Sequence, residues 1–589
     1  MTRRRFLTLG CLVLAGVATA SVPRIDEKAD PCRRSIVDPV RIVWERSPGL
    51  SYGEGKEGLG SSVLLGRHYG QVPEGPMWTG SGLKMVSDGT NAPALLLDYG
   101  RELNGGIRIG VGAFTTGMMK LRIRFGESVA EAMSELGEKG SCNAHTMRDM
   151  TVDVTPEGGS HEFGSTGFRF VRIDLLSAGE FCIESVQAVS LMRPMEPIGF
   201  FRCSDERLND VFATAVRTVH LCCQQHIWDG IKRDRLVWMG DLHPEAMAVL
   251  AVFGKADVLS DSLDYMIATT DPEKMWMNNI ATYSMWFVRI VRSWYLQTGD
   301  LAFLHRHRSY LMATLNHLVS CIGEDGMFRT TTERTLLDWP TEHNPKAKEA
   351  GVQGLLALAL KDGVSLARAC GDGRTEQSCL KALDAVMGND GISVNGSKPA
   401  AALLALAGIW DAKRAYADVL GRNGHCGVST FYGYYMLEAM SLAGENRRAI
   451  DTVRDYWGAM LDVGATSFWE NFDIAWTNGC TRIDELPVPG RKDIHGDYGE
   501  FCYKGYRHSL CHGWSSGPAA WLINHVLGIR PLAPGCRRVA VRPFLGDLEW
   551  AEGAMALPTG EAVRVRVERN TTGDLDVKVD APDWVQVER

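Results

Sequence analysis

Hydrophobic and polar residues follow two different periods along the 589-residue chain, and the changes of period divide it into three regions. Residues 36–197 carry the two-residue alternation of β-strands: apolar and basic side chains alternate over residues 119–125, and a second extended run spans residues 168–175. Glycine-rich breaks such as residues 104–106 separate these runs. The pattern predicts an N-terminal β-sandwich domain.

The period becomes helical from about residue 200 to residue 530. Ser204 is a favourable N-cap, and Asp205 and Glu206 place acids in the first turn of the helix that follows. Further apolar stripes at helical spacing run through residues 242–268, 282–298, 300–321, 348–371, 375–388, 399–420, 431–443, 446–461 and 515–528. So many helices with few strand signals between them predict an all-α domain built from helix pairs. A closed double ring would bury them around one axis, although periodicity alone also permits an open solenoid.

Strand alternation returns after Pro531, with Val563, Val565 and Val567 on one face of a strand. A turn at residues 570–574 leads into another alternating run. Residues 531–589 are therefore expected to form a small C-terminal β-domain. The predicted fold class is multidomain, with the all-α domain flanked by two β-domains.

The first 20 residues have the features of a signal peptide. Three arginines at residues 3–5 precede an apolar run over residues 6–17, and Ala18-Thr19-Ala20 predicts cleavage after Ala20. The arginines resemble a twin-arginine export signal, although an ordinary Sec signal has the same parts and a lipoprotein site at Cys11 is a third alternative. Because the apolar run is too short to span a bilayer, we expect an exported protein, periplasmic or extracellular, without stable membrane insertion.

Composition narrows the choice of ligand. The net charge of -8 becomes −11 when residues 1–20 are removed, because they hold three arginines and no acid. With no basic block outside the N-terminus, nucleic acid is not an expected partner. The 15 cysteines form no CxxC pair, and no phosphate-loop, dinucleotide or HExxH motif occurs, so no cofactor or metal is expected. The 16 tryptophans and 15 tyrosines offer platforms for an uncharged, ring-shaped ligand.

Two stretches gather groups that can do chemistry, and the first is residues 228–245. Seven of its residues are charged, and two tryptophans, Trp228 and Trp238, lie among them. A charge run is most often a solvated helix face, but such faces rarely carry two tryptophans. The mixture suits a sugar site, where carboxylates transfer protons, cations tune their pKa values, and indoles stack on pyranose rings.

The second stretch comprises residues 466–473 and 511–517. Glu470 lies among aromatic residues at the end of a helical segment, and His512 follows about forty residues later. Two structural alternatives stay open: an aromatic core with Glu470 as a helix cap, and a satisfied structural histidine at position 512.

Together these residues resemble glycoside hydrolase family 78, the α-L-rhamnosidases, over most of the chain. The segments that carry the resemblance are residues 98–105 and 166–173 in the β-half, residues 283–286, 295–300 and 338–340 in the helical half, and then Trp469, Glu470 and His512 in the family's order. The resemblance implies a six-hairpin (α/α)6 barrel. It also implies an inverting hydrolase that removes terminal α-L-rhamnose, or a related deoxy sugar, from glycans or glycosides.

One motif departs from the family pattern, which commonly reads D-C-P-x-R-x-E-R-L-G-W-x-G-D with the glutamate as general acid. Anchored on Trp238-x-Gly240-Asp241, that glutamate falls on Asp234, so this chain has the shorter acid. Asp229 needs a one-residue slip to match the leading aspartate, and Gly230-Ile231 replaces C-P. The carboxyl group of Asp234 would then reach less far than that of a glutamate. The difference is about one methylene, or one C–C bond of about 1.5 Å. Rhamnose specificity is accordingly a weaker expectation than glycosidase chemistry.

The resemblance also implies roles for individual residues. Asp234 is expected to be the general acid and Glu470 the general base, with their carboxyl groups about 6.5–9.5 Å apart. The basic neighbours at 232, 233 and 235 would lower the pKa of Asp234 if they faced it, so we expect them to face elsewhere. The expected sugar-binding residues are Asp229, Trp238, Asp241, Trp339, Trp469 and His512.

Two rival interpretations come from other classes: a carbohydrate-binding protein that kept the barrel and lost catalysis, and a lyase acting on a uronic-acid linkage. Loss of the acidic and aromatic residues would favour the binding protein. Both carboxylate-bearing stretches are present, which favours an enzyme acting on an oligosaccharide or glycoside.

Overall fold

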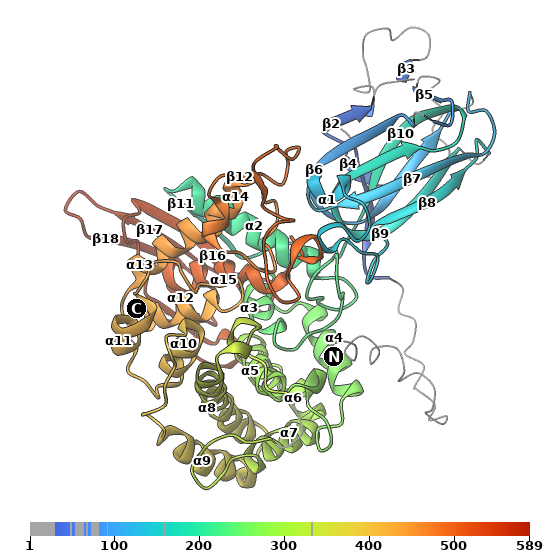
Figure 1. The fold of residues 1–589 in the computed structure, drawn as a ribbon. Helices are drawn as coiled ribbons and strands as arrows, with labels where there is room; N and C mark the ends of the chain where they lie inside the picture. The colour runs from blue at the N-terminus through green and yellow to red at the C-terminus, as the bar shows by residue number, and fades with distance from the viewer. Residues whose placement is uncertain are drawn as a thin grey trace. The chain divides into compact units, whose positions relative to one another are not determined.

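The computed structural model describes residues 30–46, 50–52, 64–65, 69–71, 82–90, 92–112, 114–157, 159–330 and 334–589. The predicted signal peptide lies outside these residues. Within them, an N-terminal β-domain, a helical domain and C-terminal strands follow one another in the predicted order (Figure 1).

The N-terminal domain is one hydrogen-bonded sheet, with ten strands among the described residues. The predicted alternation over residues 119–125 is confirmed, because Met119, Leu121, Ile123 and Phe125 of strand β7 are all buried. The predicted sandwich is therefore built from a single continuous sheet around one apolar core. Its strands are β1 (Arg33–Val37), β2 (Arg41–Arg46), β3 (Leu50–Tyr52), β4 (Tyr69–Gln71), β5 (Leu83–Ser87), β6 (Ala94–Val111), β7 (Met119–Gly126), β8 (Asp149–Val154), β9 (Ser160–Leu175) and β10 (Gly179–Met192).

A polar insertion follows β7 and carries groups that reach the helical domain. Ser128 caps the short helix α1 (Val129–Met133) by accepting a hydrogen bond from the Glu131 N–H, and Glu131 in turn accepts the Glu127 N–H at 2.8 Å. This arrangement is a variant of the capping box, whose Ser-x-x-Glu pattern is visible in the sequence.

The helical domain contains the predicted helices, with some of the predicted stretches divided into shorter helices and one different cap. Its helices are α2 (Glu206–Cys222), α3 (Leu242–Phe253), α4 (Asp257–Thr269), α5 (Ala281–Thr298), α6 (Leu301–Arg306), α7 (Arg308–Ser320), α8 (Pro345–Ala369), α9 (Gly373–Met387), α10 (Lys398–Ala407), α11 (Ala412–Ala415), α12 (Gly433–Leu442), α13 (Asn446–Thr452), α14 (Gly458–Asp462) and α15 (Gly517–Trp521). The stretch predicted as one helix over 242–268 is interrupted at Gly254, which has φ +70°, and that over 399–420 at Gly408, with φ +71°. Glycine adopts this left-handed backbone without steric cost and so ends a helix.

The cap of α2 is Asp205 rather than the predicted Ser204. The Asp205 carboxylate accepts the Arg207 N–H at 2.9 Å, whereas the Ser204 hydroxyl accepts the N–H of Glu549 at 3.0 Å. Either residue type can cap a helix, and the tertiary contact with the C-terminal segment decides between them.

The helices close into a ring. Among the described residues, α3, α5, α8, α10, α12 and α15 contact one another in that order, and α15 contacts α3. The helices α2, α7, α9, α11 and α13 each contact one or two members of this inner ring from outside it. The open solenoid left possible by periodicity is therefore not what the chain forms. Helix α8 is long and apolar enough to cross a membrane by composition, but 78% of its apolar window is buried, as expected of a core helix.

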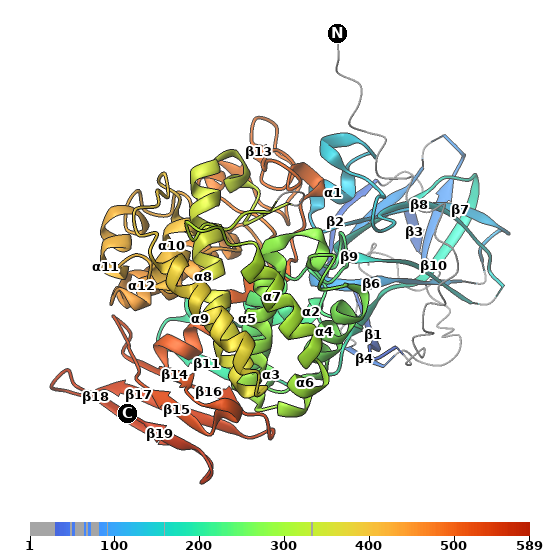
Figure 2. The same ribbon diagram turned by 90° about the horizontal axis from the view of Figure 1, so that it is seen from below.

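The C-terminal strands form two small sheets, shown in red in Figure 2. One of them also includes β11, which precedes the helical domain in the chain and pairs with β16. The chain thus leaves this β-domain, forms the ring and returns to it. The strands are β11 (Phe200–Cys203), β14 (Ile529–Pro531), β15 (Arg538–Val541), β16 (Trp550–Ala556), β17 (Ala562–Arg569), β18 (Leu575–Asp580) and β19 (Gln586–Glu588).

Candidate active site

Most of the charged stretch, residues 228–241, is a loop between α2 and α3, and residues 242–245 begin α3, so the stretch is not a solvated helix face. Asp229 closes it: its carboxylate accepts the Leu236 N–H at 3.0 Å, and its own N–H donates to the Leu236 carbonyl at 3.0 Å. At the tip, Asp234 and Arg235 have φ of 54° and 58°. Two successive non-glycine residues in the left-handed region are costly, and such strain is concentrated at functional sites.

Asp234 lies where a substrate can reach it. Its side chain is 24% exposed, and its carboxylate accepts the indole N–H of Trp238 at 3.2 Å. The second contact comes from the N-terminal β-domain, where Nδ1 of His145 lies 3.2 Å from Oδ1 of Asp234. Nothing in the sequence around His145 points to this role, so it was missed.

The three basic neighbours of Asp234 face elsewhere, as predicted. The Lys232 ammonium group lies 2.9 Å from a carboxylate oxygen of Glu127. The Arg233 guanidinium pairs with Glu470. The Arg235 guanidinium donates to the Ser165 carbonyl at 3.0 Å and stacks 4.4 Å above the Trp228 ring.

Glu470 is buried in an irregular segment and does not cap a helix. One carboxylate oxygen pairs with Arg233, and the other accepts the Ser509 N–H at 3.1 Å. Both contacts fix the orientation of the carboxylate, as a general base requires. The adjacent Trp469 has no exposed surface and packs edge-on against Phe472 and His508, so it forms part of the core instead of the expected sugar platform.

His512 and Asp241 form a second buried pair beside Asp229. Nε2 of His512 lies 3.1 Å from Asp241, and the Tyr283 hydroxyl donates to the same carboxylate at 3.3 Å. Burial raises the pKa of both Asp229 and Asp241, with His512 opposing the rise. Burial lowers the pKa of His512, but the Glu470, Asp241 and Asp229 carboxylates outweigh it, so that pKa lies above its usual value.

The polypeptide backbone draws His512 against residues 228–241, named the catalytic loop because they carry the candidate general acid Asp234. Gly230 forms an isolated antiparallel bridge with His512, and a Cβ at position 230 would lie 3.0 Å from Nδ1 of that histidine. The same Nδ1 is buried and has no hydrogen-bond partner among the described residues. A buried polar atom of this kind is a ready contact for a ligand hydroxyl.

Glu245 is a third acid at this place, beyond the site residues expected from the sequence. It lies on α3 and is buried, and a Cβ at Gly513 would lie only 1.8 Å from its Oε1. Burial, Asp241 and Asp229 hold its pKa well above the usual range. Its position in the 228–245 stretch was the available signal.

Two further residues, Tyr503 and Trp339, come from other segments of the chain. Burial raises the pKa of Tyr503, with contributions from Cys502, Glu470, Asp338 and Asp241, which places its hydroxyl among the carboxylates of both stretches. Trp339 is half-buried beneath the guanidinium group of Arg334, 4.5 Å from its ring. No described contact joins Trp339 directly to Asp234 or Glu470.

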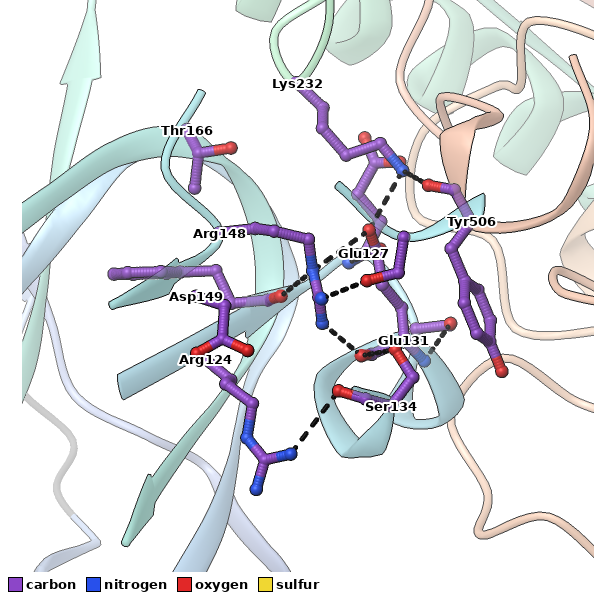
Figure 3. A network of polar contacts seen from close by, with 12 residues as sticks. Arg124, Glu127, Glu131, Ser134, Arg148, Asp149, Thr166, Lys232 and Tyr506 are labelled. Carbon is purple, nitrogen blue, oxygen red and sulfur yellow. Dashed lines mark hydrogen bonds and ion pairs between the residues drawn. The ribbon is translucent and has the colours of Figure 1, made fainter. Parts of the chain in front are cut away.

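Lys232 anchors the catalytic loop to the N-terminal β-domain (Figure 3). Besides Glu127, its ammonium group contacts Glu131 at 3.2 Å and donates to the carbonyls of Tyr506 at 3.0 Å and His508 at 2.7 Å. Glu127, Glu131 and His495 lie close enough together to suggest a metal site. The Lys232 ammonium group already provides a positive charge beside Glu127 and Glu131, the role that a metal ion would have.

The arrangement defines a class of protein. Glycoside hydrolases use carboxylates in different environments at one site, and here a ring of helices carries such carboxylates. Residues 196–367 match the family model of the bacterial α-L-rhamnosidase six-hairpin glycosidase domain, and residues 528–588 match that of the bacterial α-L-rhamnosidase C-terminal domain. Residues 196–367 and 528–588 therefore belong to domain families of the bacterial α-L-rhamnosidases.

Solved structures of rhamnosidases share the fold. The GH78 family rhamnosidase of Bacillus sp. GL1 is 22% identical, with a TM-score of 0.71 over 88% of this chain and 56% of that one. A rhamnosidase from Klebsiella oxytoca with rhamnose bound is 18% identical, with a TM-score of 0.63 over 84% of this chain and 95% of that one. The Streptomyces avermitilis α-L-rhamnosidase complexed with L-rhamnose is 17% identical, with a TM-score of 0.65 over 86% and 50%.

This chain thus spans about half the length of the Bacillus and Streptomyces proteins and nearly all of the Klebsiella protein. No match was found among curated proteins.

Proposed function

We propose that the protein is an inverting α-L-rhamnosidase that removes terminal α-L-rhamnose, or a related deoxy sugar, from glycans or glycosides. The observation that carries the proposal is the link between the two predicted stretches: Arg233 pairs with Glu470, and the next residue, Asp234, is open to solvent. The family of the helical and C-terminal domains supports the same sugar class.

In this mechanism Asp234 protonates the leaving oxygen while Glu470 removes a proton from the attacking water on the opposite face of the ring. The indole N–H of Trp238 and the His145 ring hold the Asp234 carboxyl in place. Arg233 and the Ser509 N–H orient Glu470. Arg233 must shift or share this carboxylate when water enters.

The buried acids have a different task. Burial raises the pKa values of Asp229, Asp241 and Glu245, and we assign their carboxyl groups to hydrogen bonds with sugar hydroxyls. The unpartnered Nδ1 of His512 adds a further polar contact. Trp238, half-buried beside Asp234, is the aromatic surface best placed for the apolar face of a deoxy sugar.

The test is hydrolysis of 4-nitrophenyl α-L-rhamnoside and of rhamnose-containing glycans, followed by NMR of the product before it mutarotates. We expect release of L-rhamnose whose first-formed anomer is β. Release of the α-anomer would contradict inversion, and release of a different sugar would contradict the rhamnose assignment.

A carbohydrate-binding protein without catalysis and a uronate lyase are the rival functions. A binding protein would retain rhamnose without turnover, and a lyase would give an unsaturated product that absorbs in the ultraviolet. The same incubation separates all three.

We further propose that the helical ring is an (α/α)6 barrel and that the protein is exported and cleaved after Ala20. The arginines at residues 3–5 and the apolar run over residues 6–17 support export. N-terminal sequencing of the protein from the periplasm or medium should begin at Ser21. Replacement of Arg4 and Arg5 by lysine should block export if the twin-arginine route is used and leave it intact if the Sec route is used.

A further inference from the structure

A surface depression adjoins Asp234 on the side of the N-terminal β-domain. Its charged and titratable lining residues are Glu131, His145, Arg148, Lys232, Arg233 and Arg507, contributed by both domains. His145 connects the depression to the catalytic loop, because its Nδ1 lies 3.2 Å from the Asp234 carboxylate. The depression is open to solvent there, since the His145 side chain is 32% exposed.

Most of the cations in this lining already have acidic partners. Lys232 contacts Glu127 and Glu131, and Arg233 pairs with Glu470. Arg148 donates to the Glu131 carbonyl and lies 3.7 Å from its carboxylate.

Arg507 is different. It is half-buried at the rim of the depression, and in the part of the chain that the structure describes no group accepts a hydrogen bond or forms an ion pair with its guanidinium. An arginine fork held beside a site without a partner is suited to bidentate recognition of a carboxylate or sulfate.

The position of the depression assigns it to the leaving group. A general acid contacts the glycosidic oxygen, so the sugar being released and the group that leaves lie on the two sides of its carboxyl. Trp238, which donates to the Asp234 carboxylate, and the nearby Asp229 are the residues assigned above to the rhamnose ring. The side of His145 and Arg507 is therefore the side of the leaving group.

We propose that Arg507 and the surrounding positive lining form a subsite for an anionic leaving group, so that the preferred substrate is rhamnose linked to a sugar that carries a carboxylate or sulfate. This inference rests on the proposed function, which supplies the role of Asp234. It adds a substrate class, because it distinguishes acidic glycans from neutral rhamnosides such as simple aryl glycosides.

The test compares substrates that differ by one charge. Rhamnosyl-glucuronic acid is paired with its methyl ester, and a rhamnosyl disaccharide with a 6-sulfated leaving sugar is paired with its unsulfated form. We expect kcat/KM for the charged member to exceed that of the neutral member by about tenfold at low salt, the size of one partly exposed charge-assisted hydrogen bond. The ratio should fall as salt is added. The two pairs distinguish a carboxylate from a sulfate as the group that is recognised.

Variants identify the residue responsible. Arg507→Gln should bring the charged-to-neutral ratio close to one, and Arg507→Lys should restore part of it. Lys504→Gln is the matched control, since Lys504 is an exposed cation three residues away that does not line the depression. Its ratio should equal that of the unaltered protein.

Binding of methyl glucuronide and of its methyl ester, followed by NMR titration, separates this proposal from the rhamnosidase assignment. Arg507-dependent preference for the anion without hydrolysis of any rhamnoside would support the subsite and overturn the proposed activity. Hydrolysis of 4-nitrophenyl rhamnoside with equal use of the charged and neutral members of both pairs would overturn the subsite and leave the activity standing.

Discussion

Arg233 forms an ion pair with Glu470, a residue 237 positions further along the chain. This contact brings the loop before α3 against the segment after α14, so that the two candidate catalytic carboxylates belong to one site. The two carboxylates nevertheless have different surroundings. The Glu470 carboxylate is buried against a cation, whereas Asp234 is partly exposed and has an indole and an imidazole as neighbours.

Replacing Glu470 by glutamine tests the general base. The amide can still accept a hydrogen bond from Arg233, but it cannot take a proton from water. We expect kcat to fall by about 10²–10⁴-fold. Circular dichroism should show an unchanged fold. Near-normal turnover in a folded variant would move the role to another carboxylate, with Asp241 the leading candidate.

Asp234→Asn tests the general acid. Activity towards substrates with poor leaving groups should be largely lost, because the leaving oxygen is no longer protonated. A dinitrophenyl rhamnoside needs little protonation and should be hydrolysed with much less impairment. The contrast distinguishes a lost acid from a lost fold. Equal losses on both substrates in a folded variant would rule out Asp234, and Asp229 or Asp241 would become the leading acid.

Trp238→Phe tests the orientation of that acid. The variant keeps an aromatic ring against Tyr283 but removes the N–H that donates to Asp234. Loss of one hydrogen bond to a carboxylate should lower kcat by about tenfold on poor leaving groups and much less on the dinitrophenyl substrate. Trp228→Phe is the control, because Trp228 stacks under Arg235 and makes no described contact with Asp234. Equal effects of the two variants would contradict the orienting role.

Lys232→Met tests the anchor between the domains. The methionine keeps the volume of the side chain but leaves Glu127 and Glu131 buried without their ammonium partner. We expect the stability to fall by about 3–5 kcal/mol, measured as a lowered melting temperature. Lys120→Met removes an exposed pair with Asp153, with side chains 54% and 50% exposed, and should cost less than about 1 kcal/mol. Adding Glu127→Gln to Lys232→Met should recover part of the loss, and no recovery would argue against the buried charges as the cause.

The same anchor predicts a pH dependence of stability. Burial raises the pKa of Glu127 from 4.5 to about 7, against the opposing effect of Lys232. Between these values the folded protein binds more protons than the unfolded chain, so the free energy of unfolding falls as pH rises through the window. The contribution of Glu127 to the melting temperature should therefore be larger at pH 5 than at pH 8. Glu127→Gln should have a shallower slope over this range, and a slope equal to that of the unaltered protein would contradict the raised pKa.

The local pattern of residues was sufficient for most of the secondary structure. The alternation at residues 119–125 and the apolar stripes of the helical region are properties of neighbouring positions in the chain, and strands and helices form where those patterns occur. The stretches around Asp234 and Glu470 could also be singled out, because charged residues and tryptophans so close together are unusual in a solvated helix or an apolar core. The direction of the three basic neighbours of Asp234 was expected on chemical grounds and is confirmed.

Contacts between residues far apart in the sequence could be identified only from the folded structure. Neither the closure of the helical ring, nor the pairing of β11 with β16, nor the approach of His145 to Asp234 is encoded in any local period. The burial of Trp469 illustrates the same limit: an indole beside the candidate base Glu470 is equally consistent with a sugar platform and with a core residue, and packing against Phe472 and His508 makes it the latter. The raised pKa values of Asp229, Asp241 and Glu245 likewise depend on burial, which is set by how segments far apart in the sequence pack together and exclude water.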